Sequence, residues 1–172
     1  MIRRLLTAGF LLTVLTSGGI GAAPAPRHLI HADVLPLALE DAFQFRKSTI
    51  YINDPKKQAH TDEEMLNFER DRTFFGAVEG PDRNLRFGEY FRFFWRADRK
   101  TSLTVRFEYR QENLGTYVQA QEIDVPVAKG TMETKFQVTG DDYLHDGRVT
   151  SWRALLIENG KIVGLTQSFL WH

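Results

Sequence analysis

The second half of the chain alternates between hydrophobic and polar residues with a period of two. The clearest run is 102–110, in which Leu103, Val105, Phe107 and Tyr109 occupy every second position. Weaker alternation is present at 88–97, 117–125 and 132–139. A period of two places successive side chains on opposite faces of a strand, so one face is buried and the other is solvated. We predict a strand in each of these four runs.

Three further β-prone runs bring the expected number of strands to about seven. They are residues 43–52, 148–158 and 161–171, and Asn159-Gly160 separates the last two. Asn-Gly between β-prone runs predicts a tight hairpin, because both turn positions require positive φ. One helix is expected near 62–72, since Thr61-Asp62-Glu63-Glu64 has the pattern of a capping box.

Strands do not alternate with helices along the chain, so a parallel α/β sheet is not expected. The pattern predicts a mainly all-β fold, with an antiparallel two-sheet sandwich of about seven strands and one short helix. We expect three parts: a targeting segment at 1–23, an irregular leader at 24–42, and a sandwich domain at 43–172 with the helical insert near 62–72.

The last eighty or so residues resemble an immunoglobulin-like or fibronectin type III-like module. Leu103-x-Val105-x-Phe107-x-Tyr109 resembles a central strand of such a module. Phe136-x-Val138-x-Gly140, followed by a turn and residues 149–157, resembles its penultimate strands, and 161–171 resembles its final strand. The resemblance implies an immunoglobulin-like β-sandwich and carries no function, because many unrelated secreted domains share this pattern.

The first 23 residues have the layout of a secretory signal peptide. Arg3 and Arg4 precede an apolar run at 5–15, and small residues follow it. The alternative is an uncleaved membrane anchor, but the run is shorter than the roughly 20 residues that a spanning helix needs. We therefore expect a periplasmic or secreted protein, with no stable membrane insertion after cleavage.

Composition narrows the possible functions. The chain has no Cys, which excludes a disulfide scaffold, a cysteine nucleophile and a thiolate metal site. Its 22 basic and 22 acidic residues give a net charge of zero, so no general attraction to nucleic acid is expected. No cofactor is predicted.

No set of catalytic residues stands out. Ser151 and His145 are close in sequence, but the chain has no Gly-x-Ser-x-Gly elbow. The acidic loop at 141–146 offers oxygen ligands for Ca²⁺, although its spacing does not match an EF-hand. Turns use the same residue types, so we predict neither a metal site nor an enzyme.

The most unusual feature is an outward face rich in arginine and aromatic residues on two predicted strands. Arg stacks on aromatic rings and pairs with carboxylates. This face is either a binding surface for an acidic or sugar-bearing partner, or a structural ladder satisfied within the chain. The candidate residues are Tyr90, Arg92, Phe94, Arg96, Arg106 and Arg110.

These features predict a non-catalytic exported module that contacts another protein in an assembly, adhesion or accessory role. One alternative is a carbohydrate-binding module that stacks sugars on Trp95, Trp152 or Trp171, although strand positions favour burial of these rings. Another is a small outer-membrane β-barrel, for which the strand count is short.

Overall fold

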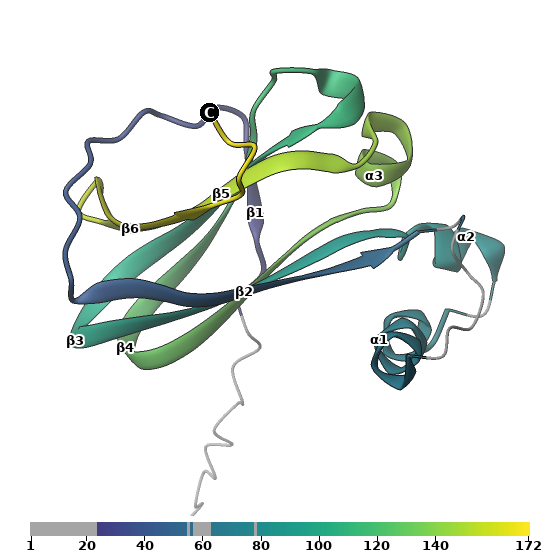
Figure 1. The fold of residues 1–172 in the computed structure, drawn as a ribbon, viewed down its shortest axis with the longest axis horizontal. Helices are drawn as coiled ribbons and strands as arrows, with labels where there is room; N and C mark the ends of the chain where they lie inside the picture. The colour runs from purple at the N-terminus through teal and green to yellow at the C-terminus, as the bar shows by residue number, and fades with distance from the viewer. Residues whose placement is uncertain (1–23, 55, 57–62, 78) are drawn as a thin grey trace, which may run out of the picture.

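The computed structural model describes residues 24–54, 56, 63–77 and 79–172. The predicted signal peptide and the Thr61 capping box lie outside these residues. Within them, the predicted mainly-β, antiparallel fold is confirmed (Figure 1): six strands form one sheet in the order β1-β4-β3-β5-β6, and β2 also pairs with β3.

The six strands differ widely in length. They are β1 (Arg27–Leu29), β2 (Phe43–Asn53), β3 (Gly88–Gln111), β4 (Gln119–Thr139), β5 (Val149–Glu158) and β6 (Lys161–Gln167). The helical elements are α1 (Glu64–Phe74), α2 (Gly80–Asn84), α3 (Asp141–Asp146) and the 3-10 turn η2 (Glu112–Leu114).

The single sheet folds over into two facing layers because β3 and β4 pass from one layer to the other. In the first layer, residues 88–97 of β3 pair with β2 and with residues 130–139 of β4. In the second layer, residues 104–111 of β3 pair with β5 and, as far as Tyr109, with the first part of β4. The rings of Phe93 and Phe107 lie 5.6 Å apart. Along one straight strand they would be about 48 Å apart, so the two halves of β3 face each other.

Four of the predicted strands are therefore the halves of two observed strands. Residues 98–102 do not form a tight turn; β3 stays extended there and changes register between Ala97 and Leu103. Residues 24–42, predicted to be irregular, contain β1 and a parallel bridge between Leu37 and Ile162. A three-residue strand is too short to show a period, so β1 could not be predicted from the hydrophobic pattern.

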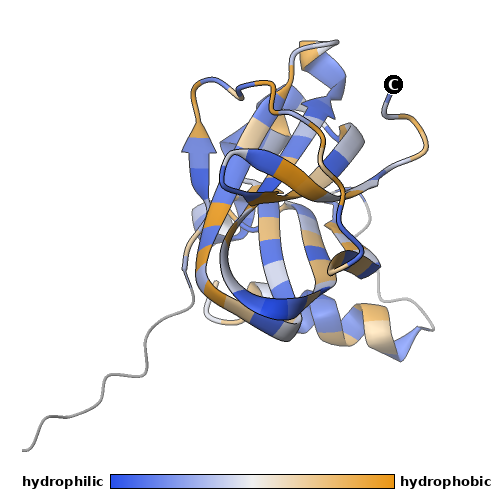
Figure 2. Cartoon of the chain, turned by 90° about the vertical axis from the view of Figure 1, so that its left-hand side faces the viewer, coloured by the Kyte–Doolittle hydropathy of each residue, from blue (hydrophilic) through white to orange (hydrophobic). Residues whose placement is uncertain are grey.

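Aromatic side chains fill the space between the layers. Phe91, Phe93, Trp95, Phe107 and Tyr109 are at most 1% exposed, and hydrophobic and polar positions alternate along the strands (Figure 2). The predicted burial of the three tryptophans is confirmed, since Trp152 and Trp171 are 9% and 7% exposed.

Two local predictions are also confirmed. Asn159 and Gly160 have φ values of 49° and 73°, as the predicted hairpin between β5 and β6 requires. The expected helix is α1, which has no buried residue. The helix continues to Phe74, two residues beyond the expected end.

Candidate functional site

A groove of about 810 Å³ lies on the outer face of the first layer. Strands β2, β3 and β4 form its floor. Helix α1 and residues 85–86 line it from one part of the chain, and the leader residues Pro24–Pro26 line it from another. We call it the basic groove. It brings together segments that are far apart in sequence.

Strand pairing arranges the floor in two rows. Thr49, Arg92 and Lys135 are paired across β2, β3 and β4, and Tyr51, Tyr90 and Gln137 form the next row. Paired residues project from the same face of a sheet. The rows are two residues apart along each strand, which is about 7 Å. A cationic row therefore lies beside a row that carries two phenol rings and an amide.

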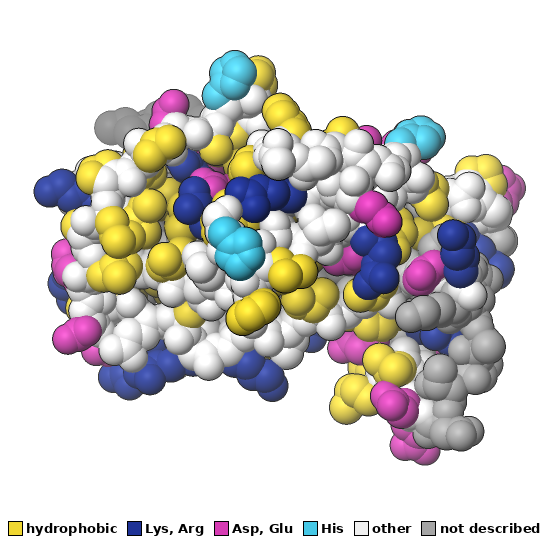
Figure 3. All heavy atoms as spheres, turned by 45° about the horizontal axis from the view of Figure 1, so that its top comes forward, with side chains coloured by type: hydrophobic (Ala, Val, Ile, Leu, Met, Phe, Trp, Pro, Cys, Tyr) yellow, Lys and Arg dark blue, Asp and Glu magenta, His cyan; other side chains and the backbone are white. Residues whose placement is uncertain are grey.

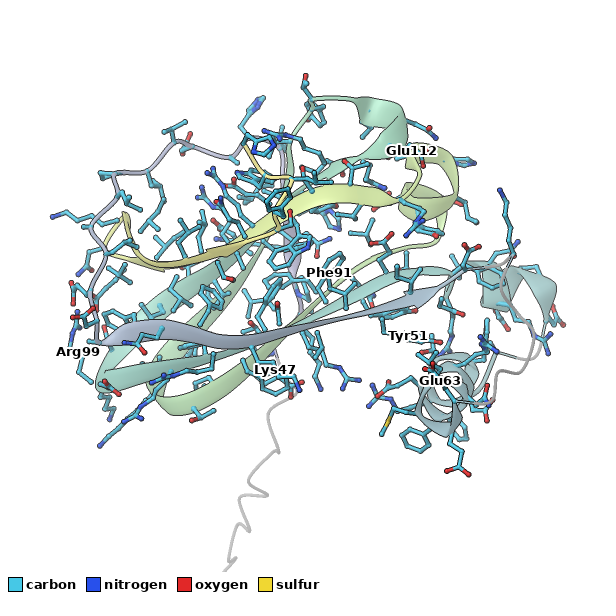
Figure 4. The ribbon with its side chains drawn as sticks, in the orientation of Figure 1. Lys47, Tyr51, Glu63, Phe91, Arg99 and Glu112 are labelled. Atoms are coloured by element: carbon cyan, nitrogen blue, oxygen red, sulfur yellow. The ribbon has the colours of Figure 1, made fainter. Side chains whose placement is uncertain are left out.

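The two tyrosines form the aromatic part of the floor. Their ring centroids are 5.9 Å apart and the planes are tilted by 38°. The Tyr90 hydroxyl donates to the Arg86 carbonyl at 2.8 Å. Burial raises the pKa of Tyr90 to about 12 and also raises that of Tyr51, so both phenols are neutral at physiological pH. Figure 4 shows Tyr51 on the side of β2 toward α1, whereas Phe91 points between the layers.

The groove carries an excess of positive charge. Its lining has four cationic side chains, Arg72, Arg86, Arg92 and Lys135, and one acidic side chain, Glu69. Glu69 accepts hydrogen bonds from Arg92 Nη2 at 3.1 and 3.3 Å and pairs with Arg72 at 2.9 Å. One carboxylate thus neutralises part of the charge of two arginines, and the lining retains a net positive charge.

Polar contacts and one ring pair join α1 to the rest of the protein. Besides the Glu69 ion pair, Arg86 Nη1 donates to the Thr73 carbonyl at 2.8 Å, and the Phe74 and Phe87 rings meet edge to face at 5.5 Å. Met65 and Phe68 are 71% and 62% exposed. Polar contacts along the groove, more than burial, therefore hold the helix in place.

The six predicted site residues do not form one face. Tyr90 and Arg92 line the basic groove. Phe94 and Arg96 lie farther along the same face, outside the lining, and Arg96 pairs with Asp98 at 2.5 Å. Arg106 and Arg110 lie on the outer face of the other layer, because β3 folds over between the two groups. The prediction that these six residues share one surface is therefore wrong.

Arg106 belongs to a chain of ion pairs on the outer face of the second layer. The chain runs from Arg27 to Glu122 (2.7 Å), Arg106 (2.7 Å), Glu108 (3.6 Å) and Arg153 (2.6 Å). The leader covers part of this chain, since Arg106 Nη1 donates to the Asp33 carbonyl at 2.8 Å. Contacts within the protein therefore hold Arg106.

The C-terminal tail covers the neighbouring positions on the same face. The guanidinium groups of Arg110 and Arg153 lie 4.5 and 4.9 Å from the centre of the Trp171 ring. Arg110 also donates to the His172 carbonyl at 3.1 Å.

The sequence did not single out Tyr51, Glu69, Arg72, Arg86 or Lys135 as parts of a site. They come from two strands, a helix and a connecting segment, and no short motif joins them. Only the pairing register aligns Lys135 with Arg92 and Tyr51 with Tyr90. Once that register is known, the alternation of each strand is enough to place Lys135 and Tyr51 on the outer face.

Glu89 is an acidic residue buried between the layers. Burial raises its pKa, while the Val149 N–H (3.3 Å) and Arg148 (3.6 Å) act in the opposite direction. The acidic segment 141–146 forms α3. No group of three or more His, Asp or Glu residues in the described part of the chain has a geometry that could hold a metal ion.

Comparisons with known proteins assign no family. No family model matches the chain, and no curated protein matches it. A crystal structure of a protein from Akkermansia muciniphila is similar to 73% of this chain and to 69% of its own, with 15% identity and a TM-score of 0.47. Among the described residues, no helix is both long and apolar enough to cross a membrane.

Proposed function

We propose that this protein is an exported, non-catalytic β-sandwich module that contacts another protein in the cell envelope or outside the cell, and that the basic groove is the contact surface. The observation that carries the proposal is the groove itself. It is a concave site of about 810 Å³ that crosses three strands and combines four cationic side chains with two tyrosines. Tyr and Arg are enriched where proteins bind one another.

The layout of the first 23 residues supports export. The absence of Cys is compatible with both oxidising and reducing compartments. Because the chain has no disulfide crosslinks, core burial stabilises the fold. The aromatic interior between the layers can supply that burial.

Strand order supports a finer proposal, that the fold is immunoglobulin-like. We letter the strands in chain order from β2, leaving out the three-residue β1. Strand β2 is then A, the halves of β3 are B and C, the halves of β4 are C′ and E, and β5 and β6 are F and G. The first layer then has the order A-B-E and the second C′-C-F-G, with the short strand β1 beside C′ at residues 120–122. An immunoglobulin-like sandwich divides its strands between two sheets in the same way. Buried Tyr143 lies in the connection from E to F.

Carbohydrate binding is a second candidate function, favoured by the tyrosine row. Tyr51 and Tyr90 are only partly buried and have their rings side by side in a groove. The tryptophans first considered as a stacking platform are buried. Binding on a glycan array that is lost in a Tyr51→Ala variant of unchanged melting temperature would favour this candidate.

Capture of the partner from native envelopes tests the proposal. The bait is the full chain, compared with an Arg72→Glu/Lys135→Glu variant of the groove. Lys129→Glu/Lys161→Glu is the matched control, because both of its lysines are exposed, lie outside the groove lining and give the same change in charge. We expect chemical crosslinking to recover one partner with the unmodified protein and the control, and at least about tenfold less with the groove variant. Recovery of monomer alone, or equal capture by all three baits, would overturn the proposal.

A further inference from the structure

We infer that the basic groove binds an extended, acidic segment of the partner protein. This inference rests on the proposed function and names the chemistry that the groove recognises. A carboxylate of the segment would lie over the cationic row formed by Arg92 and Lys135, and the apolar or aromatic side chain two residues away would lie over the tyrosine row.

The protein already places a carboxylate of its own in the groove. Glu69 reaches from α1 to Arg92 of β3 at 3.1 and 3.3 Å, and it pairs with Arg72 of its own helix at 2.9 Å. The groove therefore accepts an acidic side chain carried on a polypeptide backbone, and Glu69 shows one position that such a group takes. A carboxylate of the partner would add to Glu69 or replace it.

Cationic groups remain for further carboxylates. Lys135 contacts exposed Glu133 at 3.5 Å, a surface pair that contributes little. The Arg86 side chain donates to a backbone carbonyl, which carries no net charge. With four cations and one acid in the lining, the charge of the groove is complementary to an acidic ligand.

The distance between the two rows matches an extended peptide. Side chains two residues apart on one face of an extended chain are about 7 Å apart, which is also the separation of the cationic and tyrosine rows. A segment that alternates acidic and apolar residues at every second position would meet both rows at once. This spacing predicts the sequence pattern of the ligand.

The edge of the sheet favours a peptide over a charged sugar chain. Among the described residues, β1 pairs with β4 only at residues 120–122, and no strand pairs with that edge at residues 130–139. The floor of the groove reaches this part of β4 through Lys135, Gln137 and Thr139. Gln121 Nε2 donates to the Gln137 carbonyl at 2.9 Å, and the other backbone groups of an unpaired strand edge can pair with an extended peptide.

Fluorescence anisotropy with a defined peptide tests the inference. The probe is a labelled peptide of repeated Glu-Ser-Leu-Ser units, which puts acidic and apolar residues at alternate positions of one face. The control probe replaces each Glu by Lys. We expect the full chain to bind the acidic peptide and not the basic one, and the affinity to fall as the ionic strength rises from about 0.15 M to about 1 M.

Matched variants locate the binding. Lys135→Glu should weaken binding by about tenfold, whereas Lys129→Glu, which removes the same charge outside the groove lining, should leave it nearly unchanged. Glu69→Gln removes the internal carboxylate and should tighten binding by about threefold. Glu64→Gln on the same helix is the control for that change in net charge, because exposed Glu64 does not line the groove.

The remaining outcomes separate this inference from the proposed function. If polygalacturonate binds and the acidic peptide does not, the ligand is a charged glycan and the peptide inference is wrong. If neither probe binds but capture from native envelopes still depends on the groove, the proposed function stands and the peptide inference is wrong, because the groove recognises its partner by other chemistry. Equal binding by Lys135→Glu and the unmodified protein would place the peptide elsewhere and overturn the inference.

Discussion

The tail residues Phe169 and Trp171 show how differently two neighbouring aromatic side chains can be used. Trp171 is 7% exposed and contacts the guanidinium groups of Arg110 and Arg153. Phe169 is 92% exposed. Both residues belong to the turn at 168–171, in which the Trp171 N–H donates to the Ser168 carbonyl at 3.1 Å. Trp171 thus anchors the tail to the second layer, whereas Phe169 has little contact with the rest of the protein.

Truncation of these two residues should have very different effects on stability. Trp171→Ala removes a buried ring and two cation–π contacts, and we expect it to lower the free energy of unfolding by about 3 kcal/mol. Phe169→Ala should change it by less than about 0.5 kcal/mol, since little burial is lost. Urea titration of both variants measures these values, and equal losses would show that Trp171 does not anchor the tail.

The buried carboxyl group of Glu89 should make stability depend on pH. Burial raises its pKa above the ordinary value of 4.5, so the folded protein holds this proton more tightly than the unfolded chain does. The resulting stabilisation is complete below pH 4.5 and is lost as the pH rises through the folded-state pKa. Glu89→Gln should therefore gain in melting temperature relative to the unmodified protein as the pH is raised from about 4 to about 7.

Exposed Glu112 provides the control for this pH dependence. Glu112→Gln should follow the unmodified protein across the same pH range. If the Glu89→Gln profile also ran parallel to that of the unmodified protein, the Glu89 carboxyl would not be the source of the pH dependence.

At the scale of elements, the bend in β3 and β4 separates what the sequence predicts from what it does not. Alternation from Leu103 to Tyr109 and from Phe91 to Trp95 predicted both the strands and their buried faces, because a period of two follows directly from strand geometry. It did not predict that both runs belong to one strand. That depends on long-range packing of Phe93 against Phe107.

The same limit applies to the candidate site. Tyr90 and Arg92 were found because they are outward residues of a clearly alternating strand. Arg106 was assigned to the same face because the folding over of β3 leaves no local signal. Lys135 and Tyr51 join the site through pairing register alone, and Glu69 joins it through the position of a helix with no buried residue.

The first residue of β3 should be sensitive to any side chain. Gly88 has a φ of 150°, and a Cβ atom there would lie 2.7 Å from the Thr139 Cα of the paired strand. Gly88→Ala should cost about 3 kcal/mol or more of stability, from overpacking together with backbone strain. Gly115 also has positive φ, 59°, but a Cβ there would meet nothing within 4 Å.

Gly115→Ala is thus the control for backbone strain alone, with an expected cost of about 1–2 kcal/mol, because its φ of 59° and ψ of −117° lie in a region that L residues rarely adopt. Denaturant midpoints of the two variants test the difference. Equal costs would mean that the β3–β4 pairing at Gly88 is looser than the structure indicates.

At the scale of the whole molecule, the two outer faces differ in what covers them. The leader and the C-terminal tail lie over the second layer, where Leu35 packs against a small cluster of Leu155, Ile157 and Ile162. Figure 3 shows this side of the molecule, on which hydrophobic and basic side chains lie close together. The outer face of the first layer carries the basic groove, with Pro24–Pro26 and α1 in its lining. The groove on this outer face is the surface that we propose for partner binding.

Site-specific photocrosslinking in native envelopes tests this proposal most directly. A photoreactive residue at Gln137 would stand on the exposed floor of the basic groove, and one at Lys161 would stand on the other layer, beside the β5–β6 turn. We expect irradiation to give a single adduct with a partner protein from position 137 and none from position 161. Monomer alone from both positions, or the same adducts from both, would contradict the claim that the groove is the contact surface.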